Sequence, residues 1–173
     1  MSAYDTQKHP FVSYLMARAD DRAMLAALRR GLGAEPGDPE TAGMFPYVVP
    51  WINEWYEEAD IYMIASLFAL HPDPAKGGNM GQHILALDPD LRKQKPEDRS
   101  KHPIERRFVQ LLRMRRDSLE PRLRQQISIL KSKEVRVNWH QLMRDVRYWD
   151  HPKRFVQREW ARSFWRSNQS KST

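Results

Sequence analysis

The arginines of residues 104–130 are the side chains whose type and spacing suggest chemistry in this sequence. A guanidinium group donates paired hydrogen bonds that match the oxygens of a phosphate or carboxylate. In the first half of the stretch, apolar side chains recur at steps that place them on one helical face, namely Ile104, Phe108, Leu111 and Leu112. The remaining sides, and those of a second helix, carry Arg107, Arg113, Arg116 and Arg124. The unit therefore predicts a helical hairpin that presents cations to a polyanion.

Within this hairpin, we expect Arg116 and Arg124 to be the best phosphate contacts. Arg115 projects with the buried stripe, so we expect it to be an ion-pair partner within the fold. Ser118 is expected to cap the second helix with its hydroxyl, because serine is favoured at that position.

A second row of arginines runs along the last helix of the chain. Its inner stripe is Val156, Trp160 and Phe164, and its outer stripe is Arg154, Arg158, Arg162 and Arg166. Successive cations rise by about 6 Å per step, which resembles the spacing of phosphates along an extended strand. Lys153 adds a further cation, and Asp150 with Pro152 is expected to start the helix. A solvated amphipathic face remains the alternative explanation of this row.

Arg29 and Arg30 form a third candidate, at the end of a helix that Asp20 or Asp21 can cap. Cations are favoured at a helix C-terminus in any case, so a purely structural role leads for these two. Base stacking is a further way to hold a single strand. Most tryptophans lie on apolar stripes and are expected in the core, whereas Trp165 is the freest candidate for stacking.

No catalytic set is recognisable in the sequence. None of the six histidines pairs with another at helical metal-ligand spacing, and there is no cysteine, nucleophile elbow or dinucleotide fingerprint. A nuclease built on scattered acids such as Glu105, Asp117 and Asp145 stays open as an alternative. Glu105 and Asp117 are well placed to pair with Arg106, Arg107 or Arg116, which favours a structural role. We therefore expect a binding protein, with no catalytic residue, metal ligand or cofactor, rather than an enzyme.

The elements that position these side chains are predicted to be all α-helical, in a compact bundle of about seven to nine helices without a sheet. Residues 53–70 form the longest apolar helix, with Trp55 on its apolar face, and should lie at the centre. Asn138 can cap the penultimate helix. Residues 71–81 are predicted to be a flexible connector, and residues 88–103 a second long connection.

Charge is distributed unevenly along the chain, although the net charge is +7. Residues 101–173 carry 19 Lys and Arg against 7 Asp and Glu, while residues 1–100 carry 10 against 15. We expect one domain over residues 1–173, with an acidic lobe to about residue 100 and a basic lobe after it. The absence of cysteine agrees with a reducing compartment, and no long apolar run is present. A cytoplasmic protein without a membrane partner is expected.

The sequence also resembles a known family, the CasB-type small subunit of the type I-E CRISPR surveillance complex, Cascade. The resemblance covers most of the chain, in order and spacing. It runs from Leu28, Arg29 and Arg30, through Pro46, Tyr47, Val48, Val49 and Pro50, to Glu105, Arg106, Arg107, Phe108, Leu111, Leu112 and Arg116, and ends in the two tryptophan-rich last helices.

This resemblance implies an all-helical, non-catalytic subunit present as two copies in a ribonucleoprotein. Its implied partners are the backbone and large subunits, a second copy of itself, and the target and non-target DNA strands, with crRNA contacted indirectly. The resemblance points to Arg29, Arg30, Arg107, Arg116 and Arg124 as DNA contacts, and the charge pattern adds Arg113, Lys153, Arg154 and Arg158. The alternatives are an architectural subunit whose basic face contacts protein, and a general nucleic-acid-binding helical module.

Overall fold

The protein is built from α-helices joined by short 3-10 turns. The computed structural model describes residues 8–166, in which ten α-helices and no β-strand are present, so the all-α prediction is confirmed. The α-helices are α1 (Pro10–Ala17), α2 (Arg22–Arg30), α3 (Phe45–Val48), α4 (Glu58–Leu70), α5 (Met80–Leu85), α6 (Pro96–Arg99), α7 (Pro103–Arg113), α8 (Leu119–Ser132), α9 (Trp139–Arg147) and α10 (Phe155–Trp165). The 3-10 turns are η1 (Pro39–Met44), η2 (Val49–Trp51), η3 (Trp55–Glu57), η4 (Pro89–Lys93) and η5 (Arg116–Ser118).

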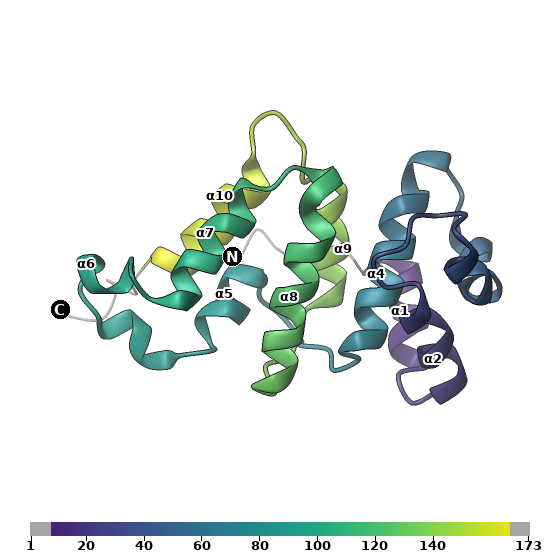
Figure 1. Cartoon of the computed structure of the whole chain (residues 1–173), viewed down its shortest axis with the longest axis horizontal. Coiled ribbons are helices and arrows are strands. Elements are labelled where there is room, and N and C mark those ends of the chain that lie inside the picture. The colour runs from purple at the N-terminus through teal and green to yellow at the C-terminus, as the bar shows by residue number, and fades with distance from the viewer. Residues whose placement is uncertain (1–7, 167–173) are drawn as a thin grey trace.

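The helices form three groups along the long axis of the molecule (Figure 1). At one end, α1 and α2 lie beside α4, and α4 packs most extensively on α2. In the middle, α8 and α9 both contact α4. At the other end, α10 packs against α5, and α7 contacts α5 and α8. The change of charge near residue 100 is therefore not a spatial boundary, because α5 precedes it in the chain yet packs with α7 and α10.

Helix α4 runs through the first group and is buried almost all round. Every residue from Asp60 to Ala69 is buried, which agrees with a predicted central helix. Its start differs from the prediction, since the chain forms η3 first and Trp55 is 84% exposed. Glu57, Glu58 and Asp60 mark the true first turn, where acids are favoured by the helix dipole. No helix within residues 8–166 is long and apolar enough to cross a membrane.

Several helix starts follow the capping rules. Asp21 accepts a hydrogen bond from the Met24 backbone N–H at 3.0 Å, and Asn138 caps α9 in the same way. Ser118 occupies the N-cap position of α8, but its hydroxyl donates to Asp117 at 3.1 Å, so the predicted hydroxyl cap is wrong. The neighbouring acid is the better acceptor for a serine O–H.

The start of the last helix also differs from the prediction, because α10 begins at Phe155 rather than at Asp150. Arg154 has a left-handed backbone conformation with φ of 49°, which interrupts any helical path from residue 150. Asp150 instead accepts a hydrogen bond from the Arg116 backbone N–H at 3.0 Å. The loop between α9 and α10 is thus held against the start of η5.

The connection at residues 71–81 is tied to the fold, in contrast to the flexible connector that was predicted. His71 hydrogen-bonds the Val135 carbonyl at 2.7 Å, and Pro74 forms an isolated bridge with Val137. Gly81 lies within α5, where a Cβ atom would come within 2.1 Å of the Trp160 carbonyl oxygen. Glycine at this position lets α5 and α10 approach closely, and neither helix reveals that contact from its own sequence.

Candidate nucleic-acid interface

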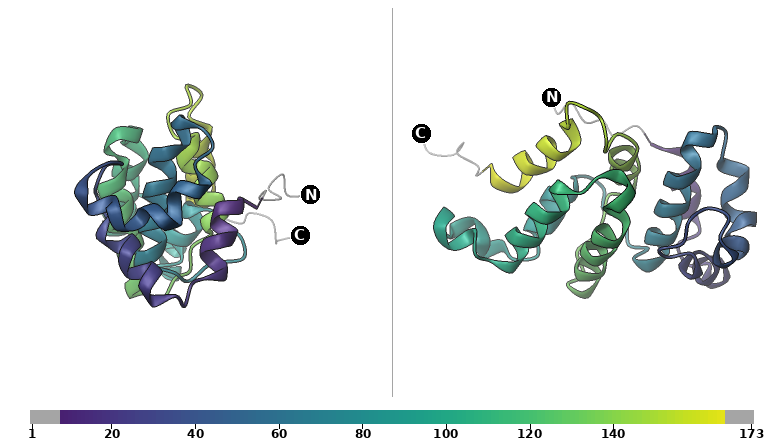
Figure 2. Two further views of the ribbon diagram at one scale, coloured as in Figure 1. Left: turned by 90° about the vertical axis from the view of Figure 1, so that its right-hand side faces the viewer. Right: turned by 45° about the horizontal axis from the view of Figure 1, so that its top comes forward.

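Two connections that are far apart in the sequence meet at the end of α7. The Trp149 indole N–H donates to the Met114 carbonyl at 2.9 Å, and the Arg154 guanidinium donates to the Leu112 carbonyl at 2.5 Å. Together with the bond from the Arg116 backbone to Asp150, they fix the α7–α8 and α9–α10 connections side by side (Figures 1 and 2).

Five exposed cations lie on these connections and on the adjoining turn of α10. We refer to them as the basic rim: Arg113, Arg115, Lys153, Arg154 and Arg158. None of the five forms an ion pair with an acid in the part of the chain that the structure describes. The prediction that Arg115 is a buried ion-pair partner is wrong, because α7 ends at Arg113 and the chain turns outward before η5. Four of the predicted DNA contacts lie within this rim.

Arg116 has a different environment from the rim. Its side chain is 23% exposed, and its guanidinium donates from Nε, at 3.0 Å, and from Nη2 to the carboxylate of Asp60 on α4. Since this charge already has a partner inside the fold, we do not build the proposed interface on Arg116. Its role as a phosphate contact stays a prediction.

Arg29, Arg30 and Arg124 form a second group where the end of α2 approaches α8. Arg29 and Arg30 are exposed and have no ion pair among the described residues. Arg124 pairs with Glu120 at 3.5 Å, and its Nη1 lies 3.1 Å from where a Cβ atom on Gly33 would be. Gly33 has φ of 77°, so the close approach and the left-handed backbone both favour glycine there.

An acidic hollow of about 580 Å³ separates the two groups of cations. Five carboxylates line it, and only two arginines accompany them, Arg116 and Arg147; the acids are Glu35, Asp60, Asp117, Glu120 and Asp150. Burial raises the pKa of Glu120, and the nearby Glu35 raises it further against the opposing effect of Arg124. The nine predicted residues therefore do not form one continuous surface, because a polyanion crossing this hollow would meet carboxylates.

The arginine row of α10 is partly as predicted. Arg158 and Arg162 are exposed along the helix, and Arg166 is exposed at its C-cap position. Arg154 is exposed too, but it precedes the helix in the left-handed conformation and belongs to the rim. Arg107 on α7 is half-buried, and its Nε has no hydrogen-bond partner among the described atoms.

The aromatic side chains are mostly structural. Trp139, Trp149 and Trp160 are fully buried, which confirms their predicted place in the core. Trp165 is half-buried and packs against Phe108 and Phe164, with ring centroids 5.3 and 4.8 Å away, so it is not the free stacking platform that was expected.

The exposed aromatic residues that sequence reasoning missed are Trp55 and Tyr56. Their rings meet edge to face at 5.9 Å, and the Arg147 guanidinium lies 5.5 Å from the Tyr56 ring. The acids at residues 57–60 were the available signal, since they mark a helix that begins after Trp55.

The candidate catalytic acids do not converge. Glu105 is buried and pairs with Arg99 at 2.9 Å, rather than with the arginines beside it in sequence. Asp145 is buried and accepts hydrogen bonds from Gln141 at 2.8 Å and Trp160 at 2.7 Å; burial raises its pKa to about 6. Within residues 8–166, no group of three or more His, Asp or Glu side chains is placed to hold a metal ion.

Fold and surface together define a class: a small all-helical protein with a rim of unpaired surface cations and its carboxylates engaged in structural contacts. The sequence profile of the CRISPR-associated protein Cse2 family matches residues 24–165. The CRISPR-associated protein Cse2 of Thermus thermophilus is 31% identical over 147 residues, which cover 83% of this chain and 79% of that protein. The chain therefore belongs to the Cse2 family, which confirms the resemblance to CasB-type small subunits.

Solved structures show the same fold. The crystal structure of M. ruber CasB is similar with a TM-score of 0.67 and 31% identity, over 90% of each chain. A chain of a CRISPR RNA-guided surveillance complex is similar with a TM-score of 0.74 and 26% identity, again over 90% of each chain.

Proposed function

We propose that this protein is a non-catalytic subunit of a type I-E CRISPR RNA-guided surveillance complex, where it holds the DNA strands of the R-loop. Its partners in that complex are the backbone and large subunits and a second copy of itself. Membership of the Cse2 family and the similarity to a surveillance-complex chain support the assembly. The observation that carries the DNA contact is the basic rim, because its five cations lack acidic partners within residues 8–166.

The proposed contact is with phosphates rather than bases. The rim consists of flexible, exposed cationic side chains, and the tryptophans nearest to it, Trp149 and Trp160, are fully buried. Phosphate contacts provide affinity and position, while pairing with the guide RNA reads the sequence. The displaced non-target strand, which has no partner strand, is the main expected ligand, and Arg29, Arg30 and Arg124 offer a second contact beyond the acidic hollow.

A double charge reversal in the assembled complex tests the proposal. With Arg113→Glu and Lys153→Glu, retention of DNA should weaken for all target sequences, and the slope of log K against log salt should fall by about 1.5 to 2. Lys131→Glu with Lys133→Glu is the matched control, because it makes the same charge change on exposed residues at the opposite end of α8. The control should leave the slope unchanged.

The outcomes separate the proposed role from a purely architectural one. If the rim variant folds and assembles but binds DNA with the wild-type salt slope, the proposal is wrong. If the rim variant folds but fails to join the complex while the control joins it, the rim contacts an acidic protein surface, and the architectural role replaces the proposed one.

A further inference from the structure

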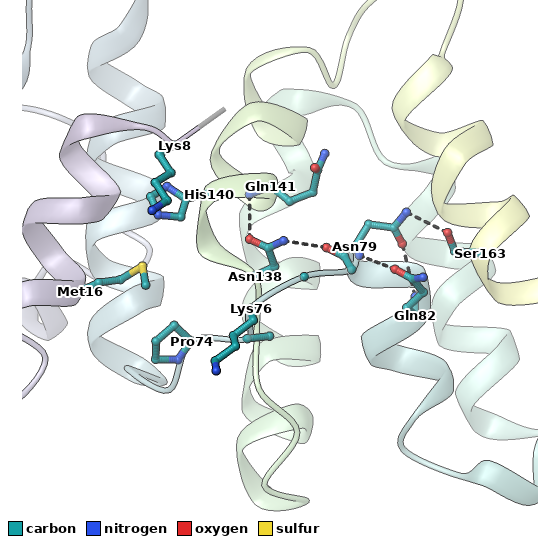
Figure 3. Close-up of a pocket in the computed structure, with 13 residues that line it drawn as sticks. Lys8, Met16, Pro74, Lys76, Asn79, Gln82, Asn138, His140, Gln141 and Ser163 are labelled. Carbon is teal, nitrogen blue, oxygen red and sulfur yellow. Dashed lines mark hydrogen bonds between the residues drawn. The ribbon is translucent and has the colours of Figure 1, made fainter. Parts of the chain in front are cut away.

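The largest hollow of the described chain lies away from the basic rim, between α1 and the pair α5 and α10 (Figure 3). Its volume of about 740 Å³ is in the range of small-molecule binding pockets. The connection between α4 and α5, the first turn of α9 and Ser163 of α10 complete its walls. The sequence patterns predicted no binding role for this region.

The charge of this hollow is opposite to that of the acidic hollow. No aspartate or glutamate is among its described lining residues, whereas Lys8 and Lys76 both line it. Neither lysine has an ion-pair partner in the described part of the chain. Two unpaired lysines that enter one concave surface from different segments favour an anion.

The floor of the hollow is a glycine-bearing connection that a buried side chain holds in place. Asn138, 5% exposed, donates from Nδ2 to the Gly78 carbonyl at 3.0 Å and caps α9 with its Oδ1. Its own backbone N–H donates to the buried ring of His83 at 3.1 Å. The N–H groups of Gly77 and Gly78 make no hydrogen bond with any described residue. The fixed, exposed connection therefore leaves donors available without a need to reorganise.

The opposite wall carries neutral polar groups. Figure 3 shows Lys8 on the α1 side and Gln82 and Ser163 on the α5 and α10 side. Gln82 uses its Oε1 to accept the Asn79 N–H at 2.8 Å, which leaves its amide NH₂ as a donor. Ser163 accepts from Asn79 at 2.9 Å, so its hydroxyl proton is available. Amides and hydroxyls of this kind bind the edges of nucleobases.

We propose that this hollow binds one nucleotide of a single strand. Lys8, Lys76 and the Gly77–Gly78 amides hold the phosphate, while Gln82 and Ser163 bind the edge of the base. No aromatic side chain is among the described lining residues, so the base is held by its edge rather than by stacking. The inference rests on the proposed function and adds a site to it. Arg162, exposed and adjacent to Ser163 in α10, links the hollow to the row of cations that begins at the rim.

Amide chemical shifts of the ¹⁵N-labelled full chain, titrated with a thymidine tetranucleotide, test this site directly. The Gly77 and Gly78 signals should shift on binding, and Lys8→Ala with Lys76→Ala should weaken the affinity read from these signals by about fivefold or more. Lys101→Ala, which removes an exposed lysine outside the hollow, should not change it.

Three results would overturn the inference and are distinguishable from one another. Shifts at Arg113 and Lys153 with unchanged Gly77 and Gly78 signals would leave the proposed function standing and remove this site. Equal shifts at equal affinity with inorganic phosphate would show that only an anion is bound, without the base. Gly77 and Gly78 shifts that the double lysine variant leaves unchanged would show that the lysines do not hold the phosphate.

Discussion

Arg116 of η5 and Asp60 of α4 form an ion pair that joins segments 56 residues apart in the sequence. Both side chains are largely buried, with exposed fractions of 23% and 12%. The pair fixes the start of α8 against the central helix, and the Arg116 backbone at the same time holds Asp150. One arginine thereby ties three segments together beside the basic rim.

Removing one partner of this ion pair should destabilise the fold. We expect Arg116→Met to lower the free energy of unfolding by about 2 kcal/mol, because Asp60 would keep a poorly solvated charge without its donors. Arg113→Met, on an exposed rim residue, should change it by less than about 0.5 kcal/mol. Urea denaturation of the two variants at neutral pH measures the difference, and equal losses would contradict a structural role for Arg116.

Gly81 should not tolerate a side chain. A Cβ atom there would lie 2.1 Å from the Trp160 carbonyl oxygen and 2.9 Å from its carbon, and both are backbone atoms that can move only with α10. We expect Gly81→Ala to lower the free energy of unfolding by about 2 to 3 kcal/mol. Gly43→Ala is the control, since its Cβ would meet only the Ala27 methyl at an ordinary 3.9 Å. A Gly81→Ala protein as stable as this control would show that α5 and α10 can separate without loss.

Asp145 should make the protein less stable as pH rises from about 4 to about 6. Its pKa is raised to about 6 by burial, so the folded chain keeps a proton that the unfolded chain has released near 3.8. Relative to Asp145→Asn, the wild-type protein should therefore lose about 3 kcal/mol of stability across that window. Chemical denaturation of both proteins at pH 4, 5, 6 and 7 gives the difference, and a difference independent of pH would refute the shift.

His83 should act in the opposite direction over the same range. Burial lowers its pKa to about 4, and its ring accepts the Asn138 N–H, so the folded chain resists a proton that the unfolded chain binds below 6.5. Relative to His83→Gln, the wild-type protein should gain about 3 kcal/mol as pH rises from about 4 to about 6.5. The same denaturation series tests this, and the glutamine side chain of the variant can still accept the backbone N–H. Since the two groups oppose each other, the wild-type profile should be flatter than either variant's.

Much of the fold could be predicted from local sequence patterns. Apolar residues at steps of three and four identified the buried faces of α7, α8, α9 and α10, and capping residues such as Asp21 and Asn138 marked helix starts. These predictions succeeded because helical periodicity and capping depend on residues within a few positions of one another. The start of α10 failed because contacts from Asp150 and Arg154 to the α7–α8 connection override the local preference.

The candidate interface was predictable in composition but not in layout. The excess of cations after residue 100 and their places outside the apolar stripes follow from the sequence, as does the resemblance to the CasB-type family. Which of them remain unpaired does not follow, because an ion pair depends on chain segments that meet only in the folded state. Asp60 reaches Arg116 across 56 residues, and the acids of the hollow come from four separate segments.

The sequence by itself determined that the chain is helical, cationic in its last third and built around buried tryptophans, since residue type and periodicity express these properties directly. Only the tertiary structure decided that Arg116 is held by Asp60, that Arg113 and Lys153 lie together on one rim, and that a second hollow free of described carboxylates lies between α1 and α10. These relationships depend on how helices pack, because packing brings distant charges within a few ångströms and leaves others facing solvent.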